Sequence, residues 1–205
     1  IKQGELFPIM KQPTDEYIVV SALASELPNA LPQKILFTGV GKVNATHILT
    51  RYLVDHPEVK KVINYGTCGG VHGVKKGEVV KVTTFIQGDM DCGPLTEGSG
   101  ITFGDDVAIS DVLNFGTDGL ICRTQDQFID EIESLDMLQH LLEGNKFNVV
   151  DMEAYALAKV CTMLHKAFQC YKYISDDAED DFKKINIPPC FIHLWIIEHD
   201  TVSHL

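Results

Sequence analysis

The acidic residue with the clearest potential for chemistry is Glu153, which lies in the stretch VVDMEA at 149–154. A β-branched pair precedes Asp151, and apolar residues recur at helical spacing from Ala154 onward. A helix is therefore expected to begin there, with Asp151 as its cap and Glu153 in its first turn. The positive end of the helix dipole favours an ionised carboxylate at that place. Such a group accepts two hydrogen bonds at once, which suits a vicinal diol such as a ribose, although a carboxylate at a helix start is also a common structural feature.

Four further candidates each stand just after a predicted strand. Glycines at 66–70 would give a ligand close access to backbone N–H groups, unless the run is a plain tight turn. Glu26, Phe128 and Asp176 follow other strands and could face the same ligand. Taken alone, Glu26 is typical of an exposed helix position, Phe128 of a core, and Asp176 of a solvated acidic run.

The elements that must position these residues are alternating strands and helices. Runs rich in β-branched and aromatic residues predict strands at 16–22, 34–38, 61–65, 78–87, 120–124, 146–150 and 169–174. Apolar periodicity and turn residues predict helices at 23–27, after the glycine turn at 39–44 to about 55, at 134–142, and from 153 onward. This order predicts an α/β fold, with three layers (α/β/α) and a central mixed β-sheet. Ligands in such folds bind outside the carboxyl ends of the strands, where the candidate residues stand.

Composition predicts an ordinary globular protein forming one domain over residues 1–205. A net charge of −12 argues against nucleic acid or an anionic membrane as the partner. No apolar run approaches the roughly 20 residues of a membrane span, and no signal pattern opens the sequence. Six scattered cysteines without a CxxC pair indicate buried, reduced thiols. A cytoplasmic protein is therefore expected.

Signatures of cofactor and metal sites are incomplete. The turn GVGKVN at 39–44 matches only part of the dinucleotide fingerprint, because Asn44 replaces the third glycine. Asp89 and Asp91 have no further ligands at metal-site spacing, so hydrogen-bonding carboxylates are expected instead. A P-loop, an HExxH motif and a GxSxG elbow are also absent from the sequence. No metal and no organic cofactor is predicted.

Four segments together resemble the nucleoside phosphorylase/nucleosidase superfamily, and most closely the 5′-methylthioadenosine/S-adenosylhomocysteine nucleosidases. They occur in the family's order and at about its spacing, as GVGKVNA at 39–45, INYGTCGG at 63–70, VDMEA at 150–154 and ISD at 174–176. The resemblance implies hydrolysis of the N-ribosyl bond of a purine nucleoside, with release of adenine and without a cofactor. It also implies a homodimer.

The resemblance implies roles for individual residues. Asp176, entering protonated, would deliver a proton to N7 of the base, and Glu26 would deprotonate the attacking water. Glu153 would hold the ribose hydroxyls, Met152 would pack against the sugar, and Phe128 would stack on the purine. The complete set of expected substrate-binding residues is Glu153, Met152, Phe128, Ser175, Thr67, Gly69, Val40 and Leu23, the last two near an apolar 5′ group.

Departures from the family keep two alternatives open. Superfamily phosphorylases hold phosphate with arginines, which are missing at 21–26 and before Gly66, so water is the expected nucleophile. A phosphate-dependent phosphorylase remains the first alternative, since the run Thr67-Cys68-Gly69 resembles that branch. The tail at 183–205 diverges from the family's long final helix, which prompts the second alternative, a nucleoside-binding protein without catalysis.

Overall fold

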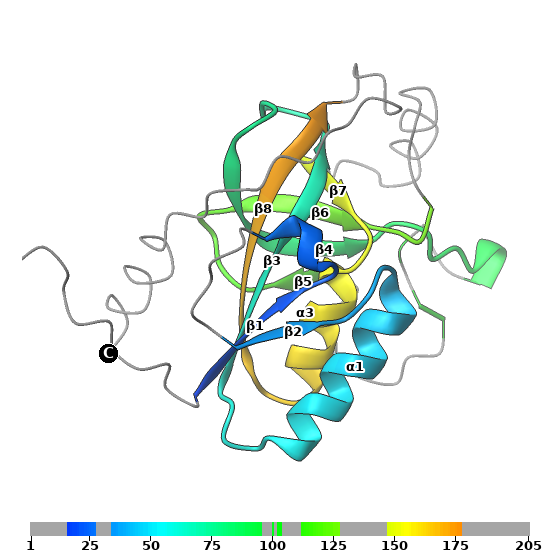
Figure 1. The fold of residues 1–205 in the computed structure, drawn as a ribbon. Helices are drawn as coiled ribbons and strands as arrows, with labels where there is room; N and C mark the ends of the chain where they lie inside the picture. The colour runs from blue at the N-terminus through cyan, green and yellow to red at the C-terminus, as the bar shows by residue number, and fades with distance from the viewer. Residues whose placement is uncertain are drawn as a thin grey trace, which may run out of the picture.

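The computed structural model describes residues 16–27, 34–95, 100, 102–103, 112–127 and 147–177, to which all structural statements below refer (Figure 1). The strands are β1 (Tyr17–Ser21), β2 (Ile35–Phe37), β3 (Lys61–Gly70), β4 (Val79–Gln87), β5 (Val112–Asn114), β6 (Leu120–Thr124), β7 (Val149–Asp151) and β8 (Ala167–Asp177). The α-helices are α1 (Lys42–Asp55) and α3 (Ala154–Met163), and two 3₁₀ turns are η1 (Ala24–Glu26) and η2 (Gly93–Leu95).

These strands form one mixed sheet. Its order is β2-β1-β3-β7-β6-β4-β5, and β8 pairs in parallel with β3 and antiparallel with β4. Because β4 pairs with β6, β6 with β7, and β7 with β3, five strands close into a ring in the order β3-β8-β4-β6-β7. Figure 1 shows β8 running alongside β3 although the two lie far apart in the sequence. The ring brings the ends of distant strands together.

The main core lies between this sheet and the two described α-helices, which pack against one another (Figure 1). Ala45, Leu49 and Leu53 recur every four residues along α1 and are all buried, so one stripe of the helix faces the sheet. Strand β1 is buried on both faces, because Ile18 faces this core and Val19 faces a second cluster. Burial on both faces explains why β1 is a continuous apolar run rather than an alternating one.

The α/β fold class with a mixed sheet is confirmed. The strands predicted near 16–22, 34–38, 61–65, 78–87, 120–124 and 146–150 are present, as are the helices after 41 and 153. The predicted glycine-rich loop at 66–70 is wrong, because β3 continues to Gly70 and pairs there with β7 and β8. Strand β8 is also longer than predicted and contains Asp176. The helix predicted at 134–142, Phe128 and the tail at 183–205 lie outside the described residues.

Four of the cysteines that were expected to be buried thiols are buried and free, namely Cys68, Cys122, Cys161 and Cys170. Burial raises the pKa of Cys161 and Cys170 to about 12, which keeps both thiols protonated and unreactive near neutral pH. Within the described part of the chain, no helix is long and apolar enough to cross a membrane.

Candidate functional site

A cavity of about 160 Å³ opens where β3, β8 and the loops after β1, β6 and β7 meet. Nine of the ten predicted site residues line it, namely Leu23, Glu26, Val40, Thr67, Gly69, Met152, Glu153, Ser175 and Asp176. The tenth, Phe128, lies just beyond the last described residue of its segment. Segments separated by up to about 150 residues along the chain thus converge on one hollow.

Glu26 is held at the cavity by hydrogen bonds to both of its carboxylate oxygens. Oε2 accepts from the Ser21 hydroxyl and from the Leu23 backbone N–H, both at 3.0 Å. Oε1 accepts from the backbone N–H and the hydroxyl of Thr67, at 3.0 and 2.8 Å. The 3₁₀ turn η1 therefore folds the side chain back onto its own start and towards β3. Donors on both oxygens suit an ionised carboxylate, which is an acceptor only.

Gly66 allows a second charge to approach Glu26. A Cβ atom at Gly66 would lie 3.3 Å from Glu26 Oε1 and 3.4 Å from Lys172 Nζ, so both charged groups approach a residue that has no side chain. The glycines of 66–70 were expected to expose backbone N–H groups to a ligand. Instead the Thr67 N–H donates to Glu26, and the glycines make room for charged side chains from neighbouring segments.

Asp176 lies on strand β8, lines the same cavity as Glu26 and is 9% exposed. The Ser175 hydroxyl donates to its Oδ1, and the same hydroxyl lies 3.2 Å from the carbonyl oxygen of Cys68. A Cβ atom at Gly69 would lie 3.1 Å from Asp176 Oδ2, so a second glycine of β3 accommodates this carboxyl group. Asp176 is thus a buried carboxyl group facing a cavity rather than part of a solvated surface.

Glu153 is the residue just before α3, and its side chain reaches away from that helix. Oε1 accepts from the backbone N–H of Gly41, which precedes α1, at 2.9 Å. Burial raises the pKa of Glu153 to about 7, and the charge of Asp151 adds to this. Burial thus opposes the ionised form of this carboxylate, which the helix end was expected to favour.

Beneath the cavity lies an ion pair that the sequence did not reveal. Lys172 Nζ is 2.7 Å from Asp151 Oδ2, and both side chains are 1% exposed. Asp151 also accepts from the Thr124 hydroxyl at 2.6 Å and from the Ala154 N–H at 2.9 Å, so its side chain bonds the first N–H of α3. Glu153, which was expected in the first turn of the helix, stands instead at the N-cap position just before it. Although burial opposes both charges, Lys172 keeps the pKa of Asp151 below its ordinary value, and Asp151 keeps that of Lys172 well above its own.

The polar residues that were missed from the sequence include Lys172, Gln125 and Gln127. Lys172 is a fully buried lysine between Tyr171 and Tyr173 on β8, and a lone lysine at such a place is a signal that a partner exists. Gln125 and Gln127 both line the cavity, and their position after β6 was the available signal.

Asp89 and Asp91, the acidic pair after β4, were expected to be hydrogen-bonding carboxylates rather than metal ligands. Asp89 accepts from the Lys42 ammonium and from the Asp126 N–H, and Asp91 accepts from the Gly93 N–H. Among the described residues, no group of three or more His, Cys, Asp and Glu side chains is placed to hold a metal ion. Both aspartates therefore act as hydrogen-bond acceptors for the protein.

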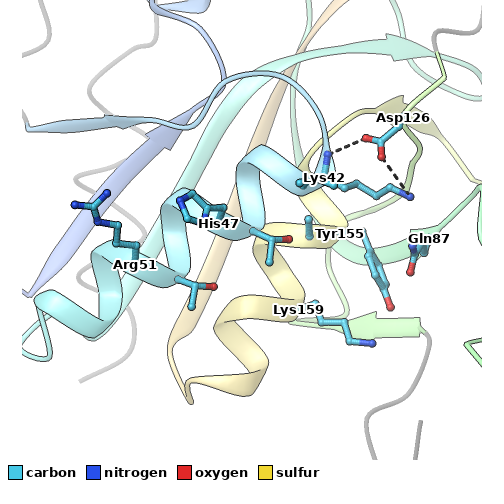
Figure 2. A pocket seen from close by; sticks show the side chains of 11 residues that line it. Lys42, His47, Arg51, Gln87, Asp126, Tyr155 and Lys159 are labelled. Carbon is cyan, nitrogen blue, oxygen red and sulfur yellow. Dashed lines mark hydrogen bonds and ion pairs between the residues drawn. The ribbon is translucent and has the colours of Figure 1, made fainter. Parts of the chain in front are cut away.

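A larger hollow of about 880 Å³ lies between α1 and α3 (Figure 2). Its lining includes His47 and Arg51 from α1 and Lys159 from α3, and Lys42 is joined to Asp126 at one end. None of the ten predicted site residues lines this hollow. The carboxylates with potential for chemistry lie in the smaller cavity, which is the candidate active site.

The fold and the cavity define an α/β protein with a small cavity at the carboxyl ends of its strands, lined by the carboxyl groups of Glu26, Asp151, Glu153 and Asp176. A model of the phosphorylase superfamily matches residues 29–187. The chain belongs to the phosphorylase superfamily.

Relatives and solved structures agree with this assignment. The chain is 33% identical over 164 residues to a 5′-methylthioadenosine/S-adenosylhomocysteine nucleosidase of Exiguobacterium sp., covering 72% of this chain and 68% of the relative. It is 27% identical over 152 residues to the Thermotoga maritima nucleosidase of the same name, covering 71% and 68%. The Colwellia psychrerythraea nucleosidase in complex with adenine matches with a TM-score of 0.67 at 19% identity, over 83% of this chain and 88% of that one. The Streptococcus pyogenes S-adenosylhomocysteine nucleosidase in complex with 5-methylthiotubericidin matches with a TM-score of 0.63 at 18% identity, over 82% of this chain and 87% of that one.

Proposed function

We propose that the protein hydrolyses the N-ribosyl bond of a purine nucleoside, such as 5′-methylthioadenosine or S-adenosylhomocysteine, and releases adenine. The observation that carries the proposal is the convergence of Glu26, Glu153 and Asp176 on one cavity. The two named relatives, which carry the name of this activity, support it. A single cavity with two kinds of carboxyl environment is what glycoside hydrolysis requires.

The chemistry assigns different tasks to Glu26 and Asp176, which both line the cavity. Cleavage builds positive charge on the sugar and negative charge on the base, so Asp176 is the proton donor to N7 and adenine leaves neutral. Glu26 acts only as an acceptor in its hydrogen bonds with Thr67, and we assign it to take the proton of the attacking water. The Thr67 hydroxyl donates to Glu26 and keeps lone pairs with which it can accept a hydrogen bond from that water.

The remaining lining residues are assigned to the substrate. Glu153 holds the ribose hydroxyls, Met152 packs against the sugar, and Phe128 stacks on the purine. Leu23 and Val40 are 44% and 41% exposed at the cavity, and we assign them to an apolar 5′ substituent. Such a substituent would cover apolar surface that is otherwise open to water.

Water rather than phosphate is the proposed nucleophile. The described residues that line the cavity include no lysine or arginine, whereas Glu26, Glu153 and Asp176 all line it. The nearest described cation below them, Lys172, is bound to Asp151. As far as the described residues line the cavity, a phosphate dianion would therefore meet carboxyl groups and no cation.

The experiment that tests the function is the release of adenine from 5′-methylthioadenosine, measured with and without inorganic phosphate. Release at equal rates in both conditions is expected. Release only with phosphate would make the protein a phosphorylase. No release from this or other purine nucleosides, combined with nucleoside binding in calorimetry, would make it a binding protein.

A homodimer in the cytoplasm is the proposed state of the enzyme, with no nucleic acid or membrane partner. Val43, on the first turn of α1, is 77% exposed and stands three residues after Val40, so exposed apolar side chains occur both at the cavity and at the start of the helix. A second subunit covering this surface would also close the 5′ end of the cavity. Sedimentation should give a dimer that Val43→Asp weakens, with a raised KM for 5′-methylthioadenosine. A fully active monomer would contradict the proposal.

A further inference from the structure

Arg123 is a buried cation for which the proposed chemistry has no use. It lies on β6 and is 1% exposed. Its Nε donates to Gln125 Oε1 at 2.9 Å, its Nη2 donates to the carbonyl oxygen of Gly88, and its guanidinium lies 5.4 Å from the centre of the Phe147 ring. Burial lowers the pKa of Arg123, which reflects the cost of removing its charge from water. Such a costly group needs a structural or functional reason.

The backbone beside Arg123 is shaped to hold the guanidinium. A Cβ atom at Gly88 would lie 2.2 Å from Arg123 Nε and 2.5 Å from its Cγ, so no other residue type fits there without moving the arginine. Gly88 thus acts as a platform across which the arginine side chain lies. The arginine is consequently fixed in place and its Nε points along the strand to Gln125.

Gln125 is the link between Arg123 and the cavity. Its side chain is almost fully buried and lines the cavity. Because arginine only donates hydrogen bonds, the atom of Gln125 that faces Arg123 must be the amide oxygen. The amide nitrogen is then turned to the backbone carbonyl oxygen of Gln127, to which it donates at 3.0 Å. Gln127 also lines the cavity, and the next residue is Phe128, which we assign to the purine face.

We propose that Arg123 is a positioning residue that acts through the Gln125 amide to fix the Gln127 carbonyl, and with it the described segment from Gln125 to Gln127 at the cavity wall that we assign to the purine. This inference rests on the proposed function. A segment already held in its binding conformation loses less conformational entropy when the base arrives. Arg123 and Gln125 therefore act on the affinity for the base rather than on the chemical step.

The first test is Gln125→Glu, which keeps the shape and the acceptor for Arg123 but replaces the donor to Gln127 with an oxygen. The KM for the nucleoside and the dissociation constant for adenine should each rise about tenfold, while kcat changes less than about threefold. The thermal midpoint should stay equal or rise, because Glu would pair with Arg123. Gln87→Glu is the matched control, because Gln87 lies on β4, pairs with Thr124 of β6 next to Gln125, and does not line the cavity.

The second test is Arg123→Lys, which keeps the charge but loses the fork that orients Gln125. It should also raise KM, and the double variant with Gln125→Glu should be no worse than the poorer single variant, because both changes break one relay. Additive effects, or an unchanged KM in Gln125→Glu, would overturn the inference. A fall in kcat and thermal midpoint with KM unchanged would indicate a purely structural role and would overturn it as well.

The wild-type protein separates this inference from the proposed function. If it neither cleaves 5′-methylthioadenosine nor binds adenine, the proposed function fails before any variant is compared. If it does both and the Gln125 and Arg123 variants behave like the Gln87 control, only the positioning role fails. Adenine binding is measured by calorimetry and does not depend on turnover.

Discussion

Lys172 Nζ lies 2.7 Å from Asp151 Oδ2 in a setting where both side chains are 1% exposed. The pair connects β8, which carries Asp176, to β7, which leads into Glu153. A buried ion pair thus joins the strand that carries the proposed proton donor, Asp176, to the strand that precedes Glu153, the residue assigned to the ribose hydroxyls.

Breaking this pair from one side should be costly. Lys172→Met leaves the Asp151 carboxylate buried without its cation, and we expect a loss of about 3–5 kcal/mol in the free energy of unfolding. Denaturation by urea measures it. Lys60→Met removes a lysine with the same Nζ–O distance of 2.7 Å to Glu16, but in an exposed pair, and should leave stability almost unchanged. Equal losses in the two variants would contradict the prediction.

Glu153 should make stability fall as the pH rises. Its pKa is about 7 in the folded protein against 4.5 ordinarily, so between these values the folded state binds more protons than the unfolded chain. The stabilisation is complete below about pH 4.5 and is lost as the pH rises through 7, by up to about 3 kcal/mol. Glu153→Gln cannot titrate, so the difference between its unfolding free energy and that of the wild type should change across pH 5–8. Parallel pH profiles would refute the assignment.

Asp176→Asn should separate an enzyme from a binding protein. Asparagine fills the same space but cannot transfer a proton to N7, so kcat should fall about 10²–10⁴-fold. Nucleoside binding, followed by calorimetry, should largely remain. Asp91→Asn, at an exposed aspartate outside the cavity, is the control and should retain full turnover. Undiminished turnover in Asp176→Asn would remove Asp176 from the mechanism.

Thr67→Val tests the support of the proposed base. The change removes the hydroxyl that lies 2.8 Å from Glu26 Oε1 and keeps the shape and the strand preference. We expect kcat to fall about 10–100-fold with a smaller change in KM, because the hydroxyl acts on the water and on Glu26. Thr84→Val, at another half-buried strand threonine, should behave like the wild type in steady-state assays. A drop in both variants would indicate a general effect of the substitution.

Local patterns were sufficient for most of the fold. The β-branched runs of β1, β3 and β4 and the glycine turn before α1 each determine their element from nearby residues. The ring of strands was not predictable, because the insertion of β8 between β3 and β4 depends on pairing between residues such as Lys61 and Ala167. No local pattern encodes a partner so distant in sequence.

The candidate site was predictable where a residue type and a strand end coincide. Glu26, Glu153 and Asp176 met that condition, and all three line the cavity. What failed depended on burial. The protonation of Glu153, the pairing of Lys172 and the use of Gly66 for close approach all follow from neighbours that only the folded chain supplies.

Strand β8 carries Lys172, Ser175 and Asp176, and it is the last strand described. During synthesis the first seven strands leave the ribosome before it, yet β3 and β4 can close their ring only by admitting it between them. The described ring of strands therefore cannot close before that strand has been synthesised. An incomplete chain ending before residue 167 would lack both the cation under the cavity and the proton donor, so we expect nascent or truncated products to be inactive and to need protection from pairing with other chains.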